Sequence, residues 1–125
     1  MSLPPALHEL EAEIMDEIWR RSPATVRDVR EALNERSEVQ RAYTTIMTVM
    51  QRLDGKGLLR RERHGRRDVY VATLTREEYA QARASAEVGA LVDEYGDVAL
   101  AHFARHMSAL DPERREQIRR LAAGD

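Results

Sequence analysis

The chain has 125 residues, of which 42% are hydrophobic and 34% are charged, and it contains no cysteine. This length fits one domain, or a small domain with an appendage. The lack of cysteine excludes a disulfide scaffold, a thiol nucleophile and a thiolate metal site. The longest apolar runs fall far short of the roughly 20 residues that cross a bilayer, and the N-terminus lacks the layout of a signal peptide. We therefore expect a cytoplasmic protein without membrane insertion.

The charge is unevenly distributed, although the net charge is only −2. Residues 1–35 carry a net charge of −4, residues 36–76 carry +6 and residues 77–125 carry −4. An anionic partner would meet the middle segment first, because charges beyond roughly 8–10 Å are screened at physiological salt. Lys56 is the only lysine, and arginine suits contacts with phosphate or guanine. A genome rich in arginine codons explains the same bias without any partner.

Apolar spacing predicts a first helix over about residues 5–21. Leu7, Leu10, Ile14 and Ile18 recur three or four residues apart, as on one face of a helix. Pro23 then ends the helical pattern.

A second helix is predicted to follow Thr25, because Asp28 stands three residues later in the spacing of a capping box. Its apolar stripe consists of Val26, Val29, Ala32 and Leu33. The helix should fade near Asn34, and the polar residues 35–40 indicate a loop.

A third helix is predicted over about residues 41–54. Its apolar side consists of Ala42, Ile46, Val49, Met50 and Leu53. Its polar side consists of Arg41, Thr44, Thr45, Thr48, Gln51 and Arg52, with Met47 on the boundary. An ordinary solvated helix face favours Glu and Lys over threonine, which is a poor helix former. Small side chains rich in hydrogen-bond donors favour a helix that enters the DNA major groove; the alternative is that the threonines cover a neighbouring element.

A β-hairpin is predicted next, with strands over residues 58–63 and 68–73 joined by a basic turn from His64 to Arg67. The alternation of Val69 and Val71 indicates the second strand. The arginines of this segment are Arg60, Arg61, Arg63, Arg66 and Arg67. Arg66 and Arg67, at the turn, favour DNA contacts more than the strand arginines do; the alternative is that the charges protect a strand edge.

Three helices followed by a hairpin define the element order of a winged helix-turn-helix. We therefore expect a mainly α protein with a small β-hairpin, in which residues 5–75 form a DNA-binding domain. Residues 76–123 are expected to form a helical dimerisation region, with helices over about 76–95 and 98–109 and a short last helix that starts at Asp111-Pro112.

The dimerisation region is predicted from apolar side chains that so short a segment cannot bury alone. They are Val88, Leu91, Val92, Tyr95, Val98, Leu100, Ala101, Phe103, Ala104 and Met107. A two-fold dimer would present two recognition helices to a palindromic DNA operator.

No residues with the spacing of a catalytic or phosphate-binding motif are found, so we expect no enzyme and no cofactor. His102 and His106 stand four residues apart, as two metal ligands on one helix face would. A third ligand is missing from the pattern, so no metal site is predicted.

Three stretches resemble the penicillinase-repressor (BlaI/MecI) family. They are Leu10-x3-Ile14-Met15-x2-Ile18-Trp19, then Val26-Arg27-Asp28-Val29, then Tyr43-Thr44-Thr45-Ile46-x-Thr48-x4-Leu53-x2-Lys56-Gly57. The segment Arg63-x-Gly65-Arg66-x3-Tyr70 is similar to the family's wing. The resemblance covers most of residues 7–123 and implies a homodimeric winged-helix repressor of β-lactamase or related genes.

With the resemblance added, the predicted DNA contacts are Arg41, Tyr43, Thr44, Thr45, Met47, Thr48, Gln51, Arg52, Lys56, Arg66 and Arg67. Met47 stands where some members of the family have arginine. The resemblance also implies relief of repression by a regulatory protease after a β-lactam signal. The corresponding cleavage site is the bond between His102 and Phe103, where better-known members have Asn before the Phe. Copper-responsive relatives carry a cysteine cluster that this chain lacks.

Two alternatives remain from the sequence. One is a winged-helix regulator that binds a small-molecule effector between its core and its tail helices. The other is a winged-helix protein-interaction module that binds no DNA.

Overall fold

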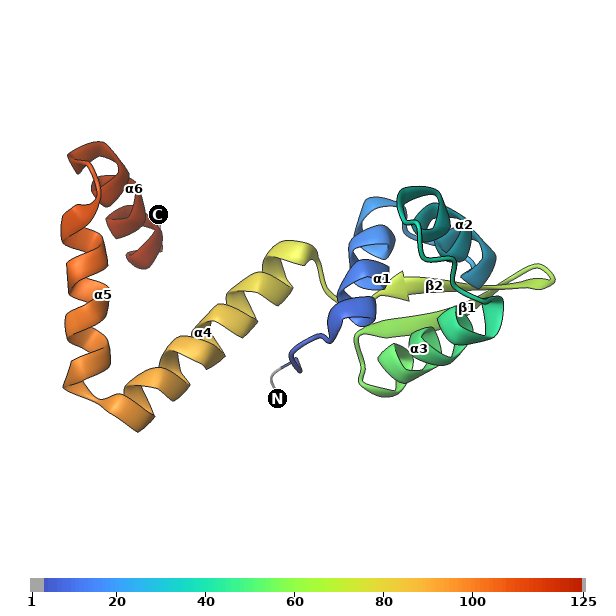
Figure 1. Ribbon diagram of the computed structural model, residues 1–125, viewed down its shortest axis with the longest axis horizontal. Helices are drawn as coiled ribbons and strands as arrows, with labels where there is room; N and C mark the ends of the chain where they lie inside the picture. Colours follow the sequence, from blue (N-terminus) through green and yellow to red (C-terminus); the bar gives the residue numbers. More distant parts are fainter. Residues whose placement is uncertain (1–3, 125) are drawn as a thin grey trace. The chain divides into compact units, whose positions relative to one another are not determined.

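The computed structural model describes residues 4–124 and contains, over that range, six α-helices and one two-stranded antiparallel sheet (Figure 1). In chain order the elements are α1 (Glu9–Arg20), α2 (Val26–Arg36), α3 (Tyr43–Gly55), β1 (Leu59–His64), β2 (Arg67–Ala72), α4 (Arg76–Tyr95), α5 (Asp97–Ala109) and α6 (Pro112–Ala122). The chain forms two compact units that divide inside α4, between Ala84 and Ser85. The expected fold class, a winged helix-turn-helix with additional C-terminal helices, is confirmed.

The first unit is built on a core shared by α1, α2, α3 and the hairpin. The fully buried side chains Ile14, Met15 and Ile18 of α1 pack against Ile46 and Met50 of α3 in one cluster. Figure 1 shows α1, α2 and α3 grouped around one end of the hairpin. Apart from Leu7, Leu10 and the two alanines, the residues of the predicted apolar stripes are therefore buried in this core.

Helix α1 begins at Glu9, later than the predicted residue 5. The backbone N–H of His8 donates a hydrogen bond of 3.0 Å to the Glu11 carboxylate. This bond caps the helix at His8, while Pro4 and Pro5 upstream disfavour helical backbone in the residues that precede them.

Helix α3 begins at Tyr43, so the prediction that Arg41 and Ala42 are helical is wrong. The Asn34 side chain holds the Arg41 backbone from both sides: Arg41 N–H donates to Oδ1 at 2.9 Å, and Nδ2 donates to the Arg41 carbonyl at 3.1 Å. Ala42 becomes the extended residue before the helix and is exposed, not buried as predicted.

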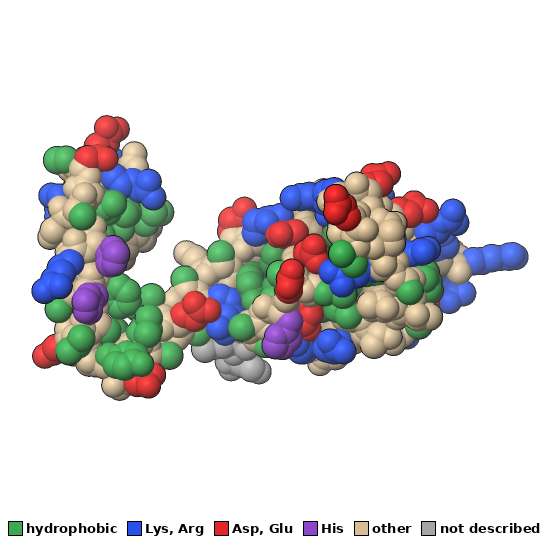
Figure 2. Space-filling view, in the orientation of Figure 1, with side chains coloured by type: hydrophobic (Ala, Val, Ile, Leu, Met, Phe, Trp, Pro, Cys, Tyr) green, Lys and Arg blue, Asp and Glu red, His purple; other side chains and the backbone are tan. Residues whose placement is uncertain are grey.

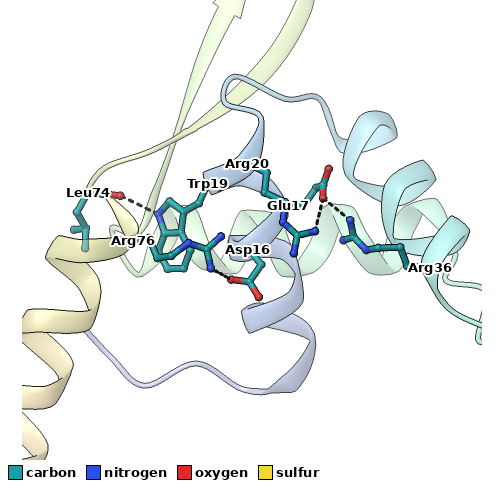
Figure 3. Close-up of polar contacts among 7 residues, drawn as sticks. All are labelled: Asp16, Glu17, Trp19, Arg20, Arg36, Leu74 and Arg76. Atoms are coloured by element: carbon teal, nitrogen blue, oxygen red, sulfur yellow. Dashed lines mark hydrogen bonds and ion pairs between the residues drawn. The ribbon is translucent and has the colours of Figure 1, made fainter. Parts of the chain in front are cut away.

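The predicted capping box of α2 is confirmed. The Thr25 hydroxyl accepts a hydrogen bond from the Asp28 backbone N–H, and the Asp28 carboxylate accepts one from the Thr25 N–H, both at 3.0 Å. The helix extends beyond Asn34 to Arg36, where Arg36 donates to the buried Glu17 carboxylate of α1 at 2.9 Å (Figure 3).

Substitution of Thr25 by alanine is expected to lower the free energy of unfolding by about 1 kcal/mol, because a donor at the start of α2 loses its partner. Chemical denaturation monitored by circular dichroism measures this value. Thr48→Ala is the matched control, because Thr48 is exposed and its hydroxyl forms no hydrogen bond within the described residues, and it should not lower the stability. Unchanged stability in Thr25→Ala would contradict the capping role.

The wing consists of β1, β2 and the two-residue turn Gly65-Arg66. Gly65 has a φ of 66°, a left-handed conformation that glycine adopts without strain. The register pairs Leu59 with Ala72 and Arg61 with Tyr70. Tyr70 and Ala72 contact the core cluster, and Val69 is also buried, with 3% exposure. The alternation of Val69 and Val71 therefore identifies the strand, but burial in β2 does not follow that alternation.

The start of α4 is fastened to α1. A second capping box, Thr75 with Glu78, opens the helix. Trp19 Nε1 donates to the Leu74 carbonyl at 3.0 Å, and Arg76 forms an ion pair of 2.7 Å with Asp16 while it lies over the Trp19 ring (Figure 3). These contacts place the first turns of α4 in the first unit.

The second unit consists of the remainder of α4 with α5 and α6. Gly96, with a φ of 58°, separates α4 from α5, and Asp111 caps α6 with Pro112 in its first turn, as predicted. None of the described residues of this unit is buried. Among the described helices, none is both long and apolar enough to cross a membrane.

Candidate nucleic-acid interface

The outward side of α3 carries a polar face that the fold does not use. We call the side chains of Thr44, Thr45, Thr48, Gln51 and Arg52 the α3 polar face; all are exposed. Within residues 4–124, none of these side chains forms a hydrogen bond or an ion pair. Their donors and acceptors are therefore available to a ligand.

Tyr43 and Met47 flank this face with different degrees of exposure. Tyr43, in the first turn, is 45% exposed. Met47 is half-buried and packs against the hydrophobic core. Its position on the boundary between the two sides of the helix agrees with the helical projection.

The structure ties the two basic residues at the ends of α3 to α1. Arg41 lies 3.7 Å from the Glu13 carboxylate, and Lys56 Nζ lies 2.7 Å from Glu11 Oε2. Glu11 is only 1% exposed. Both residues were predicted as DNA contacts, and in the structure each has an intramolecular partner that fixes α3 on α1.

The Glu11 carboxylate is held in its charged form. Burial by itself raises the pKa of Glu11, but the hydrogen bonds from Lys56 and from the His8 backbone together outweigh it and lower the pKa below its usual value. The ion pair therefore persists at neutral pH.

The wing arginines fall into two groups. Arg60 pairs with Glu62 at 2.7 Å, and Arg63 pairs with Asp68 at 3.3 Å. Arg66 and Arg67 lie at the turn and are exposed, and Lys and Arg side chains gather at the hairpin tip in Figure 2. The hydrogen bond from Arg60 lowers the pKa of the Glu62 carboxyl, with a smaller contribution from His64.

A groove of about 560 Å³ runs between α2, α3 and the wing. From α2 and its cap it is lined by Thr25, Val26, Arg27, Asp28 and Glu31. From α3 it is lined by Tyr43, Met47 and Gln51, and from the wing by Arg61, Arg67, Asp68 and Tyr70. Sequence reasoning did not include Arg61 among the contact residues. Its position in this groove follows from the pairing of β1 with β2, which places Arg61 opposite Tyr70.

The residues predicted for dimerisation lie on α4 and α5 of the second unit. Val88, Leu91, Tyr95, Val98 and Leu100 are between 43% and 63% exposed, Val92, Phe103 and Met107 are half-buried, and Ala101 and Ala104 are exposed. Figure 2 shows hydrophobic side chains gathered where α4 meets α5. Leu121 of α6, 73% exposed, was not predicted.

The predicted cleavage bond lies in the middle of α5. His102 is exposed and Phe103 is half-buried. His106 follows one turn later and is also exposed. Among the described residues, no group of three or more His, Cys, Asp or Glu side chains is placed to hold a metal ion.

Three core helices, a β-hairpin wing and an exposed polar third helix define a winged-helix protein. The sequence profile of the penicillinase repressor family matches residues 7–123. The chain therefore belongs to the penicillinase repressor family, and it is a transcriptional regulator of this type.

Relatives of known sequence and structure agree with this assignment. The transcriptional regulator BlaI of Mycobacterium tuberculosis is 37% identical over 122 residues, which cover 94% of this chain and 86% of that protein. The solution structure of the DNA-binding domain of the repressor BlaI is 30% identical with a TM-score of 0.52, and covers 63% of this chain and 94% of that one. The Bacillus licheniformis BlaI monomer, solved in complex with the blaP half-operator, is 29% identical with the same TM-score and the same coverage.

Proposed function

We propose that the protein is a homodimeric repressor that binds a palindromic DNA operator, with the α3 polar face as its reading surface. The observation that carries this proposal is the contrast between the ends and the outward side of α3. Arg41 and Lys56 pair with acids of α1, whereas the α3 polar face has no partner within the described residues. A helix that is fixed at both ends and unpaired along its outer side is suited to enter a major groove.

The wing supports the same function. Arg66 and Arg67 at its tip are exposed on a short hairpin, where guanidinium groups reach phosphates. Tyr43 and Met47, which line the groove, complete the contact surface beside the α3 polar face. The complex of a BlaI relative with a half-operator supports DNA binding.

Dimerisation is proposed for the helical region of residues 76–123, most of which lies in the second unit. Its apolar side chains stay exposed in the single chain, and burial of each large aliphatic side chain would contribute about 1.5–3 kcal/mol. A two-fold axis would place two α3 helices in successive major grooves about one turn apart. Residues 5–75 of each protomer would then contact one half-site.

We further propose that the operator lies beside β-lactamase or related genes and that repression ends when the dimer is lost. Cleavage at His102–Phe103 by a regulatory protease would interrupt α5 between two apolar residues of the proposed interface, Leu100 and Met107. Each separated DNA-binding domain would lose the linked second half-site and with it most of its affinity.

The single substitutions Gln51→Ala and Arg52→Ala test whether the α3 polar face contacts DNA. Each substitution is expected to reduce affinity for the preferred duplex about 10- to 100-fold, because a good side-chain contact to a base edge contributes about 1–3 kcal/mol of discrimination. Fluorescence anisotropy with labelled duplexes measures the change, and a thermal melt verifies the fold.

Gln117→Ala on the exposed side of α6 is the matched control and should bind like the unmodified protein. Equal affinities for Gln51→Ala, Arg52→Ala and this control would contradict the proposed reading surface.

A further inference from the structure

We infer that Arg61 is an additional contact to the DNA backbone, on the floor of the groove between α3 and the wing; this inference rests on the proposed function. Arg61 is a strand residue, opposite Tyr70 in the antiparallel register. It lines the same groove as Gln51 of α3 and is itself exposed.

The acids of the groove already have partners. The Asp28 carboxylate accepts a hydrogen bond from the Thr25 N–H and lies 3.7 Å from Arg21, Glu31 pairs with Arg27 at 3.0 Å, and Asp68 pairs with Arg63 at 3.3 Å. No ion pair joins Arg61 to an acid within residues 4–124. Its charge is therefore not compensated inside the groove.

Tyr70 is the cross-strand neighbour of Arg61. The Tyr70 ring is buried, with 3% exposure, and burial raises the pKa of its hydroxyl while the adjacent Arg61 guanidinium lowers it. The guanidinium thus rests beside a phenol that is fixed by the core.

The position of Arg61 favours a phosphate over a base. When α3 lies in the major groove and the wing lies beyond the groove edge, the sugar–phosphate backbone of one strand passes between them. Arg61 lies on the strand that faces this passage, whereas Gln51 lies on the reading helix. A guanidinium placed there meets phosphate oxygens, which give affinity without sequence information.

The test compares Arg61→Ala with Arg60→Ala in the full chain, on the preferred duplex and on a scrambled duplex of equal length. Arg60 is the matched control because its guanidinium already binds Glu62 through Nε and Nη2 and it alternates to the other face of β1. Arg61→Ala should weaken binding to both duplexes about tenfold, as expected for a hydrogen bond to a charged group. The slope of log affinity against log salt should fall by about 0.9 for each phosphate contact that is lost.

Arg61→Lys keeps the charge and should lie between the unmodified protein and Arg61→Ala. If Arg61→Ala binds like Arg60→Ala, the inference is overturned while the proposed function stands. If Arg61→Ala loses only sequence preference, the backbone assignment is overturned in favour of a base contact. If the unmodified protein shows no salt-dependent affinity for any duplex, the proposed function itself fails and the inference fails with it.

Discussion

The double substitution Leu91→Asp/Val98→Asp is expected to convert the protein to a monomer and to reduce its affinity for a full operator at least a hundredfold. The two side chains are 43% and 63% exposed on the single chain, and pairing of two chains would bury them. A carboxylate in an apolar interface is costly unless it finds a partner. Loss of the linked second site removes an avidity of about 10² to 10⁴.

Sedimentation velocity gives the oligomeric state, and anisotropy with full-operator and half-operator duplexes gives the affinities. The half-operator affinity should stay unchanged, because the α3 polar face is intact. Gln117→Asp places the same charge on a polar, exposed position of α6 and should remain dimeric. A variant that stays dimeric, or that loses half-operator affinity equally, would contradict the proposed division of roles.

Substitution of Lys56 by methionine is expected to lower the free energy of unfolding by about 2–3 kcal/mol, more than Thr25→Ala does. Lys56 is the ion-pair partner of Glu11 Oε2, and the Glu11 side chain is 1% exposed while that of Lys56 is 29% exposed. Removal of one member of a buried ion pair leaves a buried charge without its partner, and the partial exposure of the lysine reduces the usual cost. Urea denaturation at pH 7 measures the effect.

Glu11→Gln in the same background is the matched second variant. It removes the unpaired charge and keeps an oxygen for the His8 N–H, so Glu11→Gln/Lys56→Met should recover part of the lost stability. A double variant that is less stable than Lys56→Met by the full cost of Glu11→Gln alone would show that the two residues do not interact.

The same ion pair predicts how stability depends on pH. The pKa of Glu11 in the folded protein lies below the ordinary value of a glutamate, so the contribution is present above the unfolded pKa and is lost as the pH falls through the folded pKa. The difference in free energy of unfolding between the unmodified protein and Lys56→Met should therefore be smaller at pH 3.5 than at pH 7. A difference that is constant over this range would contradict the charged pair.

The sequence was sufficient to predict features that arise from short-range patterns. The capping box of Thr25 and Asp28, the Gly65 turn and the Asp111-Pro112 start of α6 each depend on neighbouring residues, and the structure contains all three. The α3 polar face followed from helical periodicity, which fixes the relative directions of side chains along one helix.

Features that depend on contacts between distant residues could not be predicted in this way. The start of α3 is set by Asn34, which binds the Arg41 backbone from α2. Lys56 pairs with Glu11, 45 positions earlier in the chain. Val69 and Tyr70 are neighbours in β2 and are both buried, which the valine alternation alone does not predict.

Selection of bound fragments from the source organism's genomic DNA, at near-physiological salt, tests the central claim most directly. The proposed dimeric repressor predicts enrichment of short inverted repeats, with half-sites about one helical turn apart, upstream of a small number of genes. Recovery of fragments without a shared motif would contradict it, because binding would then depend on phosphate charge alone.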